Sequence, residues 1–249
     1  MHDYPSNNSV RGQSGRFATT HWSVVLAAGK PESTDYEPAL ETLCRTYWFP
    51  LYAFLRRQGY GSDKAEDCTQ AFFASLLDKH GLRLADPKRG KFRSFLLTAF
   101  KHFLANERAY ARAQKRGGDR NIISLNIENA ENRYSLEPSD ELSPDKLFER
   151  SWALTVLERT MARLHSETAS AEKQQQFDLL KVYLTAEKSS VPYQKIAEKL
   201  RMTEGAVRVA VHRLRRRYRR LLRDEISQTV ASEDQVDEEI RELFAALAG

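Results

Sequence analysis

Residues 193–212 read YQKIAEKLRMTEGAVRVAVH, and the apolar side chains in this stretch have the spacing of two helices joined by a tight turn. The small residue Ala197 suits the point where such helices approach most closely. Thr203 suits the position that caps the second helix, and Arg201 occupies the turn, where Gly is common. Apolar contacts between the helices would come from Ile196, Leu200, Met202, Val207 and Ala210. The stretch therefore predicts a helix-turn-helix.

The second predicted helix continues as an arginine-rich segment up to residue 223. With about 100° of rotation per residue, its apolar side chains between Val207 and Leu222 fall in an arc of about 120°, wide enough to face a core. A separate strip of the helix is formed by Arg208, His212, Arg215, Arg219 and Arg223. No acidic residue occurs between Glu204 and Asp224, so the ion pairs of a solvated helix face are missing. We infer that the strip contacts a polyanion; the alternative interpretation is a solvated face.

The net charge of +5 is distributed unevenly along the 249 residues. Residues 83–120 hold eleven Lys and Arg against three acids, and residues 201–223 hold nine Arg against one acid. Residues 224–249 hold eight acids against one Arg. Two concentrated basic zones in a chain that is otherwise acidic indicate two separate anionic contacts.

Helical periodicity dominates the chain, and Gly (11) and Pro (8) are scarce, which favours helices over turn-rich sheets. The sequence predicts an all-α fold of two helical domains joined by a linker, with the helix-turn-helix in the C-terminal domain. The linker is expected where periodicity is lost and two prolines occur. The predicted units are an N-terminal extension with a short helix (1–37), a helical domain (38–118), the linker (119–145), the helix-turn-helix domain (146–226) and an acidic amphipathic helix (227–249).

Several classes of protein are disfavoured by the composition. No stretch approaches the roughly 20 apolar residues of a membrane span, and the apolar run at 22–29 is too short and too far inside the chain for a signal peptide. Cys44 and Cys68 lack CxxC spacing, which indicates reduced thiols in the cytoplasm. The six His form no cluster with metal-ligand spacing, so we expect no metal and no cofactor.

Three segments, AEDCTQAFFASLL, DPKRGKFRSFLLTAFKHFLANERA and YQKIAEKLRMTEGAVRVAVHRLRRRYRRLL, together resemble a bacterial extracytoplasmic-function sigma factor. The resemblance covers roughly residues 38–118 and 146–223. The FATTHWSVVLAAG opening and the acidic end are similar to those of a subgroup with extended termini. The resemblance implies a cytoplasmic, non-enzymatic subunit whose partners are core RNA polymerase and promoter DNA, and it admits an anti-sigma factor as a further partner.

The resemblance also implies roles for individual residues. Asp67 and Gln70 would face the largest subunit of the polymerase. The promoter −10 region would be contacted by Lys88, Arg89, Lys91, Arg93, His102, Arg108, Arg112, Lys115 and Arg116. The −35 region would be contacted by Thr203, Arg208, Val209, His212, Arg213, Arg215 and Arg219. His102 stands where the family often has Asn, and Val209 where it frequently has Ser, so the base preferences are expected to differ.

Other classes of protein explain less of the chain. A stand-alone helix-turn-helix transcriptional regulator accounts for residues 193–223 but leaves 65–79 and 84–116 without a role. An enzyme acting on DNA would need a nucleophile among clustered arginines or grouped metal-binding carboxylates, and the sequence offers no convincing set of either. For a helical adaptor, the two basic zones would be accidental.

The acidic C-terminal segment carries a regular apolar stripe of its own, formed by Val236, Ile240, Leu243, Phe244 and Leu247. A helix this short is marginal in isolation, so we expect it to dock on the rest of the chain. One interpretation is simple packing beside the second domain. The other is a regulatory flap whose negative charge competes with DNA for the basic helix at 201–223.

Overall fold

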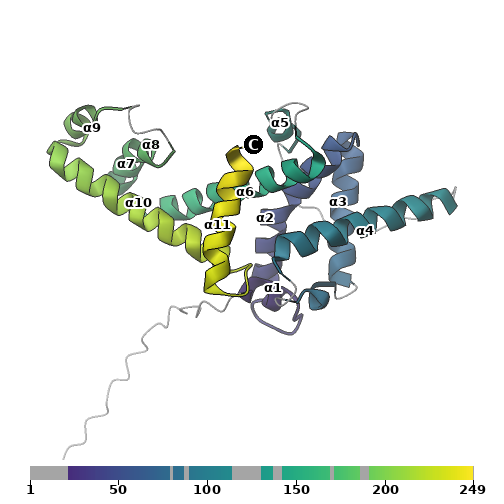
Figure 1. Cartoon of the computed structure of the whole chain (residues 1–249). Coiled ribbons are helices and arrows are strands. Elements are labelled where there is room, and N and C mark those ends of the chain that lie inside the picture. Colours follow the sequence, from purple (N-terminus) through teal and green to yellow (C-terminus); the bar gives the residue numbers. More distant parts are fainter. Residues whose placement is uncertain are drawn as a thin grey trace, which may run out of the picture.

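The computed structural model describes residues 22–78, 81–86, 90–113, 130–136, 142–168, 171–185 and 191–248. Every regular element among these residues is helical (Figure 1), so the predicted all-α class is confirmed. The elements are α1 (Ser23–Ala28), α2 (Tyr36–Arg57), α3 (Ser62–Asp78), the short 3₁₀ helix η1 (Gly81–Leu84), α4 (Phe92–Ala113), α5 (Ala130–Ser135), α6 (Pro144–Ser166), α7 (Ala171–Leu180), α8 (Val182–Thr185), α9 (Tyr193–Leu200), α10 (Glu204–Ser227) and α11 (Glu233–Ala248).

Helix α2 is the centre of the main core. Every residue from Thr46 to Leu55 is buried, and a helix that is buried all round must be surrounded by other elements. Helices α1, α3, α4, α5 and α6 pack against it, and its most extensive contact is with α6. The first half of the chain therefore folds around α2.

Segments on both sides of the predicted linker share this core. Trp152 on α6, Ile226 near the end of α10 and Leu243 on α11 belong to the same buried cluster as Phe54 of α2. In Figure 1, α11 lies across α6 beside the end of α10. The predicted domain boundaries stay predictions, but the packing extends across them.

A second, smaller cluster lies at the opposite end of the molecule from α3 and α4 (Figure 1). It contains α7, α8, α9 and the first half of α10, with Tyr183, Ile196 and Val207 among its buried side chains. Lys181 lies in a turn that separates α7 from α8. Helix α10 is long enough to belong to both clusters.

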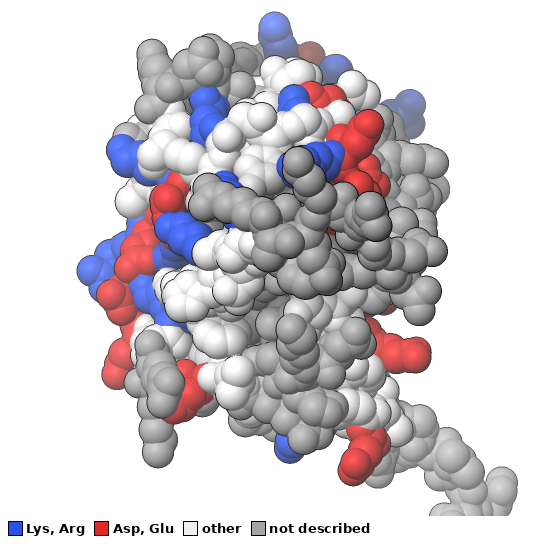
Figure 2. Space-filling model, turned by 90° about the vertical axis from the view of Figure 1, so that its right-hand side faces the viewer, with Lys and Arg blue, Asp and Glu red and all other residues white. Residues whose placement is uncertain are grey.

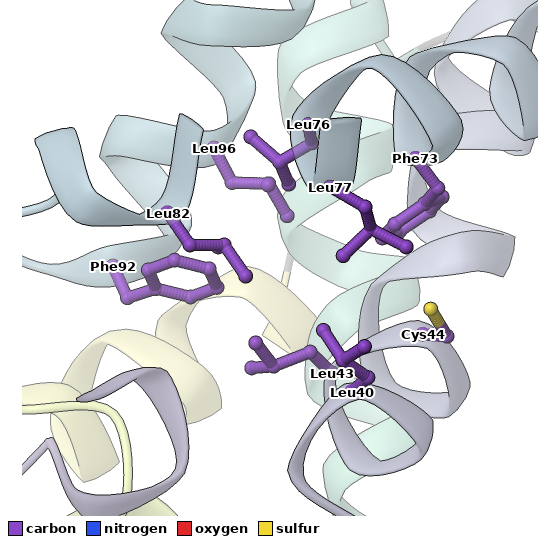
Figure 3. A pocket seen from close by; sticks show the side chains of 9 residues that line it. All are labelled: Leu40, Leu43, Cys44, Phe73, Leu76, Leu77, Leu82, Phe92 and Leu96. Atoms are coloured by element: carbon purple, nitrogen blue, oxygen red, sulfur yellow. The ribbon is translucent and has the colours of Figure 1, made fainter. Parts of the chain in front are cut away.

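A small apolar cavity lies between α2, α3, η1 and α4 (Figure 3). Its volume of about 10 Å³ is at the lower limit for holding one water molecule, and its leucine and phenylalanine walls offer water no hydrogen bond. Cys44 lies in the wall, and burial raises the pKa of its thiol to about 11. The cavity is a packing defect of the core, and its thiol is held protonated.

Candidate functional site

Helix α10 presents a basic surface to solvent along the side opposite its packed face. The exposed side chains are Arg208, Val209, His212, Arg213, Arg216, Arg219 and Arg220, and we term this set the α10 basic face. Val207 and Val211 point the other way, into the cluster with α9. The face is rotated from the predicted strip, because it includes Arg216 and Arg220 and excludes Arg215 and Arg223.

Arg215 and Arg223 do not belong to the α10 basic face, because each guanidinium contacts a neighbouring helix. Arg215 donates from Nε and Nη2 to the Tyr183 carbonyl oxygen at 3.1 and 2.9 Å, which fixes α8 against α10. Arg223 pairs with Glu233 at 2.7 Å and with Asp237, both on α11. Side chains at the edge of the apolar arc can reach across to neighbouring helices, and a helical wheel does not reveal those neighbours.

The turn between α9 and α10 has the geometry that its sequence suggests. Thr203 caps α10 by accepting a hydrogen bond from the Ala206 N–H at 3.2 Å, as predicted. Arg201 has a φ of 53° and ends α9 in the left-handed conformation. A non-glycine residue there costs on the order of 1 kcal/mol, and the Met202 N–H, which bonds the Ala197 carbonyl at 2.9 Å, helps to hold the turn.

Arg208 lies at the start of the α10 basic face and is oriented by two neighbours. Its guanidinium contacts Glu204 Oε1, one helical turn earlier, at 2.5 Å. It also lies over the ring of Tyr193 on α9, 5.2 Å from the ring centre. The group is exposed, so these contacts orient the side chain rather than stabilise the fold.

Asp67 and Gln70 do not form one surface. Asp67 is exposed on α3, whereas Gln70 is buried and donates from Nε2 to Glu66 Oε1 at 3.1 Å. Residues three apart on a helix are neighbours, but only one of this pair lies on the solvent side. Asp67 is the accessible member of the predicted polymerase contact.

Arg93 lies at the start of α4 but is almost completely buried, with an exposed fraction of 5%. Its Nε donates to Glu239 Oε1 at 2.6 Å, and its other nitrogens contact Glu149 and Glu242. The guanidinium carbon lies 4.6 Å from the ring centre of Trp152. Arg93 thus connects α4 to both α6 and α11.

Lys91 joins the same group of charges. Its Nζ lies 2.5 Å from Glu242 Oε1, 3.0 Å from Glu239 Oε2 and 3.9 Å from Glu238 Oε1. We term Lys91, Arg93, Glu149, Glu238, Glu239 and Glu242 the α4–α11 charge cluster. Two of the cations that the sequence assigned to DNA are therefore neutralised by the chain itself in this conformation.

Glu239 is the most deeply buried acid of the cluster, with an exposed fraction of 1%. A buried carboxylate is tolerated only when it is paired and hydrogen-bonded, and Lys91 and Arg93 provide that pairing. The pKa of Glu242 is lowered: partial burial opposes ionisation, but hydrogen bonding to Lys91 and the charges of Arg93 and Lys91 outweigh it. Acidification below the ordinary carboxylate range would therefore weaken the attachment of α11.

Of the other predicted −10 residues, the structure describes the side chains of His102 and Arg108. His102 is exposed, and Arg108 donates to Tyr60 Oη and Gln58 Oε1, both at 3.0 Å. Lys88, Arg89, Lys115 and Arg116 lie outside the described residues, and the side chain of Arg112 does too. Figure 2 views the right-hand side of Figure 1, the side of α3 and α4, where basic and acidic side chains are interspersed.

Among the described residues, no helix combines the length and the apolar character needed to cross a membrane. Nor do the described His, Cys, Asp and Glu side chains gather in a group that could hold a metal ion. Comparisons with known proteins give no relative, since no protein-family model, no curated protein and no solved structure matches the chain.

Proposed function

We propose that the chain is a sigma factor, which binds core RNA polymerase and directs promoter recognition at the −10 and −35 elements to initiate transcription. The observation that carries the proposal is the α10 basic face, which follows directly on α9 and a three-residue turn. The order of the three sequence motifs supports it as well. The chain itself performs no chemistry, because the polymerase supplies the active site.

The α10 basic face suits duplex DNA. In helix-turn-helix proteins the second helix enters the major groove with its amino-terminal residues against the bases. Arg208, Val209 and Arg213 lie in that part of α10, and an arginine there can donate two hydrogen bonds to guanine. Arg216, Arg219 and Arg220 lie further along, where phosphate contacts add affinity without reading sequence.

Val209 predicts that the α10 basic face prefers a particular base in duplex DNA. It is an apolar side chain with an exposed fraction of 49% among arginines, and an apolar group at this position suits the methyl group of thymine. On a duplex site selected from random sequences, replacing one contacted thymine with uracil should weaken binding about 3-fold or more, measured by fluorescence anisotropy. The Val209→Ser variant should lose this sensitivity, and an equal response of both chains would contradict the assignment.

In the first half of the chain, Asp67 would contact the polymerase. The basic start of α4 would track the backbone of melted DNA, for which a positively charged groove is the usual design. Lys91 and Arg93 can contact the DNA backbone only after the carboxylates that pair with them have moved away.

The experiment that tests the proposal is run-off transcription with purified bacterial core RNA polymerase on fragmented genomic DNA. The chain should produce discrete transcripts that core polymerase alone does not make. Asp67→Ala should reduce core binding and transcription together, whereas Glu41→Ala, an exposed acid on α2, should leave both unchanged. Absence of both core binding and transcripts would overturn the proposal.

The second candidate is a stand-alone transcriptional regulator. The α4–α11 charge cluster favours it, because Lys91 and Arg93 are occupied by carboxylates of the chain itself. A regulator would bind a specific duplex without polymerase and would not bind core. Gel filtration of the chain with core polymerase separates the two candidates.

A further inference from the structure

We propose that α11 and nucleic-acid phosphates compete for one surface, the Lys91–Arg93 start of α4, so that the chain covers its own DNA-binding cations until α11 is displaced. The inference rests on the proposed function and concerns the regulation of that site. It differs from the expected flap on the basic helix in the surface that α11 covers. The α10 basic face stays exposed, and the described ion pairs between α11 and the arginines of α10 are those of Arg223.

The chemistry of the contact makes competition direct. Glu238, Glu239 and Glu242 present carboxylate oxygens to Lys91 and Arg93. Phosphate oxygens bind the same ammonium and guanidinium groups with similar geometry. A side chain whose N–H groups already donate to carboxylates must release one of them to donate to a phosphate oxygen.

Helix α11 is suited to dissociate from the main core and to bind it again. It is 16 residues long, and a helix of that length is marginal without packing. Its apolar attachment is through a few side chains, of which Val236 and Leu243 are buried, while Phe244 remains exposed. Glu238 and Glu242 are themselves partly exposed, so a polyanion can approach their partners from solvent.

The test compares three full-length chains: the unmodified protein, Glu238→Gln/Glu242→Gln, and the control Glu41→Gln/Asp234→Asn. Both variants gain the same charge, but only the first removes carboxylates that contact Lys91 and Arg93. The control keeps Glu233, which pairs with Arg223. Glu239 is left intact because it is buried. The probe is a short fluorescein-labelled single-stranded DNA, with binding measured by anisotropy, and hydrogen exchange of residues 233–248 is followed with and without DNA.

We expect the first variant to bind roughly 2- to 10-fold more tightly than the unmodified chain, since it lacks ion pairs of partly exposed groups. The control should bind like the unmodified chain. Added DNA should accelerate exchange in α11 of the unmodified chain. Equal binding by both variants, or DNA binding without faster exchange in α11, would overturn the inference while leaving promoter recognition intact. If none of the chains binds DNA or supports run-off transcription, the proposed function fails first, and the inference fails with it.

Discussion

The Arg93→Ala variant is expected to lose about 3–5 kcal/mol of unfolding free energy. The substitution leaves Glu239 buried without the Nε contact that it accepts at 2.6 Å, next to Glu149 and Glu242. It also removes the cation from the face of the Trp152 ring. Urea unfolding followed by circular dichroism measures the change through the midpoint, provided that the slope is preserved.

Two further variants test whether the loss of unfolding free energy comes from the α4–α11 charge cluster. Arg45→Ala removes an exposed arginine paired with Glu41 and should leave the midpoint unchanged. Arg93→Ala/Glu239→Ala should recover part of the lost stability, because Glu239 then no longer has to be buried with Lys91 as its remaining cation. A loss in Arg93→Ala no larger than that in Arg45→Ala would show that the α4–α11 charge cluster contributes nothing to stability.

The second large effect concerns the α10 basic face. Replacing Arg213, Arg216 and Arg220 together with alanine should weaken binding to a mixed-sequence duplex on the order of 100-fold at about 0.1 M salt. The slope of log affinity against log salt should become shallower by about 2.7, since each lost phosphate contact contributes about 0.9. Anisotropy titrations at several salt concentrations measure both quantities.

A control with the same change in charge is Arg45→Ala/Lys181→Ala/Arg241→Ala, whose exposed side chains belong to α2, the α7–α8 turn and α11. Its affinity and salt slope should stay near those of the unmodified chain. If both triple variants lose affinity equally, binding depends on net charge alone and the α10 basic face has no special role.

Local signals in the sequence were sufficient for the helices and for the turn before α10. Periodicity and the Thr203 cap depend on residues within a few positions of each other, so they can be read directly. The sequence predicts five of the seven members of the α10 basic face, but not Arg216 and Arg220. Exposure on α10 depends on where α8 and α11 pack, and that information lies outside the helix.

The α4–α11 charge cluster could not be predicted from local patterns. Arg93 and Glu239 are 146 positions apart, and each stands in a segment whose charge suggests a different role. The apolar stripe on the acidic segment predicts that α11 docks on the rest of the chain, but not on which surface.

Helix α10 joins the main core to the smaller cluster as one continuous helix, so that a tilt at one end displaces the other end. Leu222 is held in the main core while the Glu204 end belongs to the smaller cluster, and about 27 Å of helix separates them at 1.5 Å per residue. A tilt of about 10° at the packed end would carry Glu204 through about 5 Å, which exceeds the 3.4 Å rise of one base pair along DNA. For the proposed DNA contact, small adjustments of α6 and α11 would therefore be sufficient to move the turn before α10 from one base step to the next.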